Sequence, residues 1–124
     1  MNLDILKKYN SSNIFSEKQY VFNELKLSNE LIKEFHKKLQ YYKVIDNISQ
    51  INEGKYIRWI NIYTNKLTNG ALVYDVEISD VDILIYCKTI NNKFITISYN
   101  KNVLFEKISD DELLLINVVD NFNK

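Results

Sequence analysis

The region that most constrains the fold of this chain is residues 54–108, where β-rich runs follow one another with only short polar breaks. The runs are GKYIRWINIYT, TNGALVYDVEIS, VDILIYCKTI, FITISY and VLFEKI. No break is long enough for the helix that would connect two parallel strands, so neighbouring runs must pair antiparallel. The pattern predicts four or five strands in an antiparallel meander, curled into a small β-barrel or half-barrel.

Helices are expected on both sides of these strands, which gives an α+β fold. We expect a helical N-terminal part over residues 1–50, the β-barrel over 54–108 and a C-terminal helix over 109–124. A chain of 124 residues, 46% of them hydrophobic, is long enough to bury one core without metal or disulfides. The polar segment 46–53 has no proline or glycine. We therefore expect residues 1–124 to form a single domain.

The N-terminal part has apolar side chains at helical spacing over residues 17–44. Ser16 followed by Gln19 has the form of a capping box, in which two side chains satisfy backbone N–H groups at the start of a helix. We therefore expect a helix to begin near Glu17.

These apolar positions form a heptad-like seam that is interrupted once, at Ser28. Its members are Val21, Leu25, Ile32, Phe35, Leu39 and Tyr42. Either one long helix presents the seam to a partner helix, or Ser28 or Asn29 caps a second helix over residues 30–43. Because the seam covers barely three heptads, we favour two helices or one kinked helix.

The C-terminal helix has a clear start signal. Ser109 and Glu112 form a second capping box, and Asp110 and Asp111 are favourable at a helix N-terminus. The rest of the helix is apolar on almost every side. We expect it to be buried on more than one side, against the barrel and against the N-terminal helices or a second subunit.

Alternation along the strands predicts which side chains share a face of the sheet. In the first strand Ile57, Trp59, Asn61 and Tyr63 lie opposite Tyr56, Arg58, Ile60 and Ile62. In the second, Leu72, Tyr74, Val76 and Ile78 lie opposite Val73, Asp75 and Glu77. In the third, Val81, Ile83, Ile85 and Cys87 share the apolar face. The NNK segment that follows predicts a tight hairpin turn, since Asn tolerates left-handed backbone conformations.

Few residues are suited to catalysis. His36 is the single histidine and is expected to be a solvated or partly packed helix residue, and Cys87 is expected to be a small buried hydrophobe. One His and one Cys do not make a zinc site. Gly54 and Gly70 are the only glycines, so no phosphate-binding loop can be formed. We expect no enzyme activity, no catalytic residues and no cofactor.

Two acidic clusters, residues 80–82 and 110–112, contain the oxygen ligands that calcium or magnesium prefers. The first is more simply a turn that leads into a strand, and the second is a charged helix N-terminus. We expect no metal site at either.

The best candidate for a binding surface is aromatic. Rings on a sheet can stack on bases, form a cage for a cation or anchor a protein interface. The residues that we select are Arg58, Trp59, Tyr86 and Tyr99, with Lys55, Lys88, Lys93 and Lys101 near the strand ends. The alternative is that these rings pack in the core and across strands of a tyrosine-rich protein.

Charge and hydropathy indicate which partners and which cell compartment the chain is expected to have. Sixteen basic and sixteen acidic residues leave no net field that would attract nucleic acid or an anionic membrane. No apolar run has the length of a signal peptide or a membrane span, and a single cysteine fits a reducing compartment. We expect an intracellular protein that does not associate with membranes.

The strand GKYIRWIN, the turn LTNGALVYDVEI and the segment that ends in FEKISDDELLL resemble small uncharacterised proteins of giant, A/T-rich nucleocytoplasmic DNA viruses. The resemblance covers roughly residues 54–122 and departs from the family pattern at Ala71, where a second glycine is usual. It implies a viral source, inside the host cytoplasm or the virion, and a fold type, but no site residues. The number of expected strands also resembles that of SH3-like or Tudor-like barrels.

These observations favour a non-enzymatic protein-interaction, structural or virion accessory protein of a large DNA virus. Its partner would be another protein or a second copy of the chain. The alternative is a nucleic-acid-binding small-barrel module that uses Arg58, Trp59, Tyr86 and Tyr99; the zero net charge argues against it.

Overall fold

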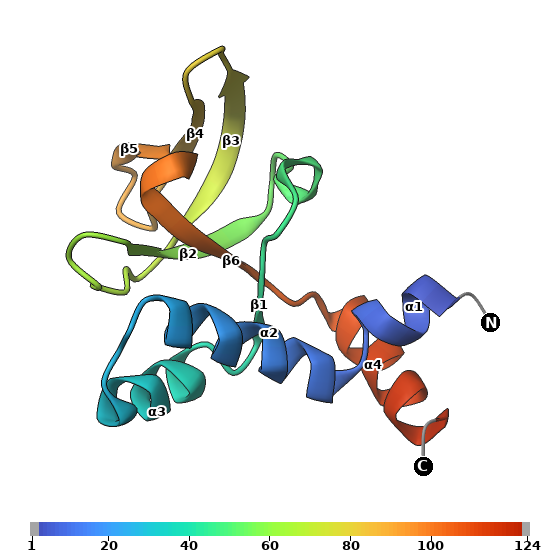
Figure 1. Cartoon of the computed structure of the whole chain (residues 1–124). Helices are drawn as coiled ribbons and strands as arrows, with labels where there is room; N and C mark the ends of the chain where they lie inside the picture. Colours follow the sequence, from blue (N-terminus) through green and yellow to red (C-terminus); the bar gives the residue numbers. More distant parts are fainter. Residues whose placement is uncertain (1–2, 123–124) are drawn as a thin grey trace. The chain divides into compact units, whose positions relative to one another are not determined.

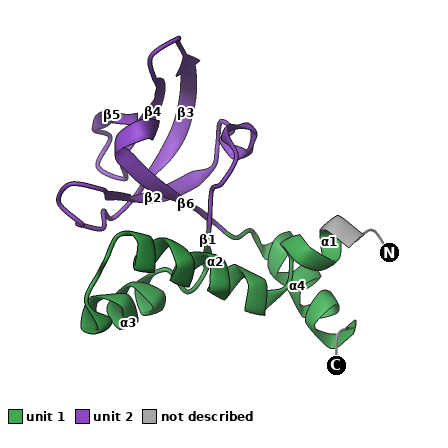
Figure 2. Cartoon of the chain, viewed as in Figure 1, with its two compact units in different colours: residues 1–43, 108–124 green, residues 44–107 purple. Residues whose placement is uncertain are grey.

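The computed structural model of the chain describes residues 3–122, which divide into two compact units (Figure 2). Unit 1 comprises residues 1–43 and 108–124, and unit 2 comprises residues 44–107. The helices at the two ends of the sequence therefore belong to the same unit. The expectation of a single domain stays a prediction.

The α+β fold is confirmed. The helices are α1 (Leu3–Lys8), α2 (Ser11–Glu24), α3 (Asn29–Lys38) and α4 (Asp110–Phe122). The strands are β1 (Tyr42–Val44), β2 (Tyr56–Asn61), β3 (Ala71–Ile78), β4 (Ile83–Lys88), β5 (Phe94–Ser98) and β6 (Asn102–Lys107). Two short 3-10 helices, η1 (Ile48–Gln50) and η2 (Tyr99–Lys101), complete the described part of the chain. Figure 1 labels the α-helices and strands.

The six strands form one antiparallel sheet in the order β1-β6-β2-β3-β4-β5. The expected meander runs from β2 to β5, and β6 then returns to pair with β2. The sheet is curled but open, so of the two expected forms the half-barrel is correct. β1 lies where the second helix was expected to end, and it adds a sixth strand to the expected four or five.

The expected start of the first long helix near Glu17 is wrong. α2 begins at Ser11, because the side chain of Asn10 accepts a hydrogen bond from the Asn13 N–H at 3.1 Å and caps the helix there. Ser16 is an ordinary exposed residue inside α2. The short helix α1 was not expected.

The preference for two helices is confirmed. Lys26 adopts a left-handed conformation with φ of 55°, and the Leu27 N–H donates to the Phe22 carbonyl at 3.2 Å. This is the Schellman pattern that ends a helix. α3 then begins after Ser28, whose side chain accepts from the Leu31 N–H at 3.2 Å.

The capping box of the C-terminal helix is confirmed. The Ser109 N–H donates to Glu112 Oε1 at 3.1 Å, and the Glu112 N–H donates to Ser109 Oγ at 3.2 Å. Within α4 the two buried residues are Ile116 and Val119. The exposed large hydrophobic residues of the helix are Leu114, Val118 and Phe122. The chain therefore covers one side of α4, and cover by a second subunit stays a prediction.

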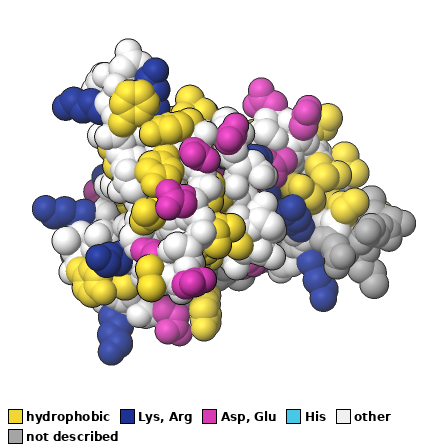
Figure 3. Space-filling view, turned by 90° about the horizontal axis from the view of Figure 1, so that it is seen from above, with side chains coloured by type: hydrophobic (Ala, Val, Ile, Leu, Met, Phe, Trp, Pro, Cys, Tyr) yellow, Lys and Arg dark blue, Asp and Glu magenta, His cyan; other side chains and the backbone are white. Residues whose placement is uncertain are grey.

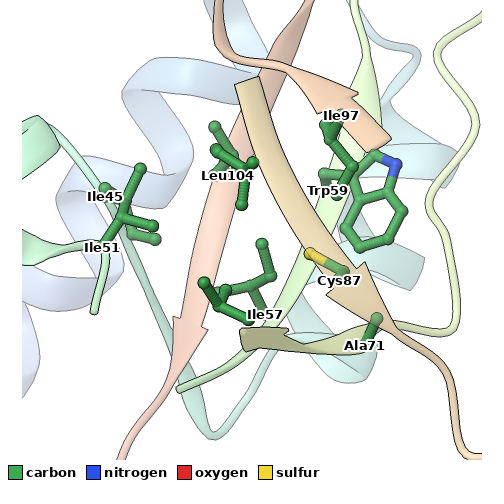
Figure 4. Packing of buried hydrophobic residues seen from close by; sticks show 10 residues of the cluster. Ile45, Ile51, Ile57, Trp59, Ala71, Cys87, Ile97 and Leu104 are labelled. Carbon is green, nitrogen blue, oxygen red and sulfur yellow. The ribbon is translucent and has the colours of Figure 1, made fainter. Parts of the chain in front are cut away.

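The core of unit 2 lies on the inner face of the curled sheet. Ile57, Ala71, Ile85 and Cys87 are each fully buried in it. Figure 4 shows how side chains from different strands meet in this core; those labelled include Ile57, Trp59, Ala71, Cys87, Ile97 and Leu104. Ile45 and Ile51 close the cluster from the segment that precedes β2.

The expected faces of β3 are wrong because of a β-bulge at Tyr74. Val73 lies opposite Cys87, but Asp75 lies opposite Tyr86, so one residue of β3 has no partner in β4. Before the bulge, Ala71 and Val73 point inward; after it, Val76 does. The expected common face of Leu72, Tyr74, Val76 and Ile78 is therefore broken, and Leu72 and Tyr74 are exposed.

Candidate functional site

The four residues selected from the sequence do not share one surface. Trp59 is only 8% exposed and belongs to the core of unit 2. The Thr68 hydroxyl bridges its backbone, since it accepts from the Trp59 N–H at 3.1 Å and donates to the Trp59 carbonyl at 3.2 Å. The indole is therefore a packing element in this structure.

Arg58 and Tyr99 are half-buried. Arg58 points to the face of β2 opposite Trp59, and its Nε donates to the Thr68 carbonyl at 2.7 Å. Tyr99 lies in η2 and packs against the core of unit 2. Of the four residues, Tyr86 alone belongs to an exposed aromatic cluster.

That cluster, which we call the aromatic patch, consists of Leu72, Tyr74, Tyr86 and Phe94. The Tyr74 ring lies 6.2 Å from that of Tyr86 and 5.5 Å from that of Phe94, with the latter pair edge to face. Leu72 is 46% exposed and Phe94 is 68% exposed. Tyr86 and Phe94 were placed on strands by the sequence pattern, but the bulge that brings Tyr74 to them carries no sequence signal.

Charged side chains border the aromatic patch. The Tyr86 hydroxyl donates to Glu77 at 2.8 Å, and this hydrogen bond raises the pKa of Tyr86. The Lys88 ammonium lies 5.6 Å above the Phe94 ring. In Figure 3 hydrophobic side chains are seen in separate groups with acidic and basic side chains beside them.

The aromatic patch ends at β5, the last strand in the order of the sheet. The Thr89 N–H donates to the Lys93 carbonyl at 2.8 Å, so this pair is hydrogen-bonded in the hairpin. Because hydrogen-bonded and non-hydrogen-bonded pairs alternate, Ile95 and Ile97 bond to β4, while Phe94, Thr96 and Ser98 direct their backbone groups away from it. No strand in residues 3–122 pairs with this outer edge.

The N-terminal end of β5 is basic, and the carboxylate of Asp82, with Lys101 near it, lies at the C-terminal end. Lys93 precedes the strand, and Lys88 lies opposite Phe94. At the other end, the Ser98 hydroxyl donates to Asp82 in a short hydrogen bond, and Asp82 also accepts from the Ile83 N–H at 2.7 Å. The Ser98 hydroxyl lowers the pKa of Asp82. The carboxylate is therefore fixed beside the C-terminal end of β5.

Unit 1 contains a cavity of about 500 Å³ that the sequence did not indicate. Its apolar walls come from Ile14 and Phe15 on α2, from Leu113 and Ile116 on α4, and from Tyr41 and Ile108. Its polar lining residues are Ser11, Lys18, His36, Gln40, Asn117 and Asp120. Both the volume and the mixture of apolar walls with a few polar groups are typical of small-molecule sites.

Lys18 is the most unusual residue of this cavity. It is 4% exposed, and its ammonium donates to the Leu39 carbonyl at the C-terminal end of α3 at 2.8 Å. That carbonyl carries the partial negative charge of a helix C-terminus, which favours a cation there. Burial lowers the pKa of Lys18 to about 8.

His36 lies beside Lys18 in the cavity lining. Its ring stacks on Phe15 at 4.1 Å, and Nε2 lies 2.8 Å from Gln19 Oε1. The Gln19 amide nitrogen donates to Asn23 at 3.0 Å, which orients Oε1 toward the histidine. Burial and the charge of Lys18 lower the pKa of His36, which favours the neutral ring. With Gln19 Oε1 as the acceptor, the proton of the neutral ring is on Nε2. The expected partly packed histidine is thus found.

Cys87 is fully buried, as expected for a small hydrophobe, and burial raises the pKa of its thiol to about 12. Among the residues that the structure describes, no three His, Cys, Asp or Glu side chains gather in a way that could hold a metal ion. The oxygens of Asp82 are engaged in the turn hydrogen bonds described above.

No family model matches this chain, and no curated protein or solved structure matches it either. In the described part of the chain, no helix combines the length and the apolar character needed to span a membrane.

Proposed function

We propose that this chain is a non-enzymatic interaction protein and that its partner is a second copy of itself, joined through the free edge of β5. The observation that carries the proposal is that Phe94, Thr96 and Ser98 direct their backbone groups to an edge that no described strand covers. Exposed edges of this kind add strands readily.

An antiparallel pair of β5 strands satisfies two-fold symmetry, with Thr96 of each copy opposite the other. Thr96 then exchanges both backbone hydrogen bonds with its equivalent, and Phe94 does so with Ser98 of the second copy. The Asn102 side chain already donates to the Ser98 carbonyl at 2.8 Å, and a carbonyl oxygen can accept a second bond.

The charges of Lys88, Lys93 and Asp82 favour the antiparallel arrangement, and Lys101 near Asp82 reduces this effect. The basic end of β5, with Lys88 and Lys93, meets the acidic end of the second copy, where Asp82 is held by Ser98. A parallel arrangement would bring like charges together. The zero net charge of the chain adds no overall repulsion.

Residues within β5 also favour self-association. Natural edge strands are commonly protected by charged residues, Pro or a bulge. The sequence of β5 is FITIS, which contains none of these, and its pairing with β4 is regular. The exposed Phe94 extends the aromatic patch to the edge, where a second copy would cover part of it.

The nucleic-acid alternative has less support. It relied on Trp59, which is buried, and the exposed ring of Tyr74 and the half-buried ring of Tyr86 lie near Asp75 and Glu77, which repel phosphate. The resemblance to giant-virus proteins supports a structural or virion accessory role for the self-associating protein, inside the infected cell or the virion.

The test is the oligomeric state, measured by sedimentation equilibrium over a series of concentrations. We expect a monomer–dimer equilibrium for the native chain and a monomer for Thr96→Pro. Proline removes an N–H that β4 does not use, and it is tolerated on edge strands in this orientation. A native chain that stays monomeric at the highest soluble concentration would overturn the proposal.

Thr96→Lys is the second variant, since it places two like charges against each other at the two-fold axis. Ser12→Lys adds the same charge to an exposed position of α2 and serves as the matched control. We expect Thr96→Lys to be monomeric and Ser12→Lys to dimerise like the native chain. Circular dichroism checks that each variant is folded.

A further inference from the structure

The cavity of unit 1 contains a buried cation without an anionic partner. Lys18 is 4% exposed and makes one hydrogen bond, to the Leu39 carbonyl. No acidic side chain in the described part of the chain forms an ion pair with it. An ammonium group has three donors, and a buried charge is stable only when it is paired or fully hydrogen-bonded. We propose that this cavity binds a small amphipathic monocarboxylate, whose carboxylate pairs with Lys18.

The walls of the cavity suit the apolar body of such a ligand. Ile14 and Ile116 are each 7% exposed and face the cavity from α2 and α4, together with Phe15 and Leu113. Their side chains would remove a short alkyl or aryl group from water, which supplies the hydrophobic part of the affinity. The volume of about 500 Å³ is within the range of small-molecule sites.

The charges around the cavity fit one carboxylate rather than two. His36 lies beside Lys18, and its lowered pKa favours the neutral ring. Lys18 is the one lysine or arginine among the lining residues that the structure describes. Asp120 belongs to the same lining, where its Oδ1 accepts from the Ser11 N–H at 3.1 Å. A second carboxylate on the ligand would be repelled by Asp120.

A simpler reading of Lys18 is that it only caps the C-terminus of α3 through the Leu39 carbonyl. The two readings differ in what the ammonium does when an anion is offered. A capping lysine keeps its pKa, whereas a ligand carboxylate favours the charged form and raises the pKa. The inference concerns unit 1 and does not depend on dimerisation through β5.

The experiment is an isothermal titration of the full chain with sodium octanoate and, separately, with 1-octanol. Both probes have an eight-carbon body, and only octanoate has the carboxylate. We expect saturable binding of octanoate and binding of octanol that is at least about tenfold weaker, since a charge-assisted hydrogen bond is lost. Absence of saturable octanoate binding, or equal affinity for both probes, would overturn the proposal.

Two variants locate the site. Lys18→Met removes the charge at similar length and should reduce octanoate affinity at least about tenfold while leaving octanol binding unchanged. Ile116→Trp should reduce the binding of both probes by filling the cavity. Lys33→Met removes an exposed charge from α3, outside the lining, and should change neither affinity. Unchanged octanoate affinity in Lys18→Met would contradict the proposal.

A readout of Lys18 itself separates the proposal from simple capping. NMR of the lysine side chains, with Lys18 assigned by its loss in Lys18→Met, gives its pKa with and without octanoate. We expect the pKa to rise from its lowered value when octanoate saturates the protein. A pKa that does not move would support the capping role alone and overturn the proposal.

Discussion

The Lys43 ammonium donates to Glu112 at 2.6 Å, and both side chains are almost fully buried, at 6% and 14% exposure. This ion pair joins β1 to the first turn of α4 across 69 positions of sequence. Glu112 is also part of the capping box, since its other oxygen accepts from the Ser109 N–H. One carboxylate therefore both starts α4 and ties it to the remainder of unit 1.

This arrangement predicts that stability falls in acid. Burial raises the pKa of Glu112, but the hydrogen bonds from Lys43 and Ser109 outweigh that effect and lower it overall. Since the folded pKa lies below the unfolded value of about 4.3, the stabilisation is fully present above that pH and is lost as the pH falls through the folded pKa. Chemical denaturation at a series of pH values from 7 to 3 should show that the free energy of unfolding falls. In Glu112→Gln the free energy of unfolding should fall less over the same pH range.

At pH 7 Glu112→Gln should lower the free energy of unfolding by about 2–4 kcal/mol, because it replaces the carboxylate that accepts from the buried Lys43 ammonium with a neutral amide. Glu34→Gln is the matched control. Glu34 pairs with Lys38 at 3.0 Å, but both side chains are about half exposed. Loss of the Glu34–Lys38 ion pair should lower the free energy of unfolding by less than about 0.5 kcal/mol. Equal effects of the two substitutions would show that the Lys43–Glu112 pair does not stabilise the fold.

The sequence predicted the features that depend on local periodicity. The strands after residue 54, a cap at Ser28 or Asn29 and the box of Ser109 and Glu112 all have short-range signals. These strands, the cap at Ser28 and the box are present, whereas β1 was not predicted. The start of α2 was missed because Asn10 and Ser16 are both good capping residues, and the apolar pattern alone does not choose between them.

The candidate site was less predictable, for reasons of geometry. Both faces of β2 are partly apolar, so alternation did not show that Trp59 points to the core. No glycine in the sequence signals the bulge at Tyr74, yet this bulge brings Tyr74 into the aromatic patch. Lys18 is one of many lysines in the chain, and its burial depends on contacts between α2 and the end of α3 that are distant in sequence.

Gly70 and Gly54 form a matched pair for a prediction about the turn before β3. Both have positive φ, of 104° and 87°. A Cβ at Gly70 would lie 2.8 Å from the Ile57 carbonyl oxygen, whereas a Cβ at Gly54 would meet nothing within 4 Å. Gly70→Ala should therefore destabilise the protein by about 2–4 kcal/mol, and Gly54→Ala by about 1 kcal/mol. Thermal or denaturant unfolding measures the difference; equal losses would contradict the steric argument.

Cys87 should report the opening of unit 2. Its thiol is fully buried and its pKa is raised to about 12, so both access and the thiolate fraction are low in the folded state. We expect almost no reaction with a thiol reagent such as DTNB at pH 8 under native conditions, and rapid reaction in denaturant. Fast labelling of the native protein would show that the core around Cys87 opens readily.

The end of α2 gives a prediction in the stabilising direction. Lys26 is an exposed residue with φ of 55°, a conformation that costs a residue with a Cβ roughly 1–2 kcal/mol and costs glycine almost nothing. Lys26→Gly should therefore increase the free energy of unfolding by about 0.5–1 kcal/mol, after the larger entropy loss of glycine on folding is included.

Lys33→Gly is the control for this change. It makes the same substitution at an exposed position inside α3, where φ is helical and glycine is unfavourable, so it should decrease stability by about 1 kcal/mol. Denaturant titrations of the two variants should give changes of opposite sign. If Lys26→Gly also destabilised the chain, the left-handed conformation of Lys26 would not be the feature that ends α2, and the break between α2 and α3 would depend on the Ser28 cap instead.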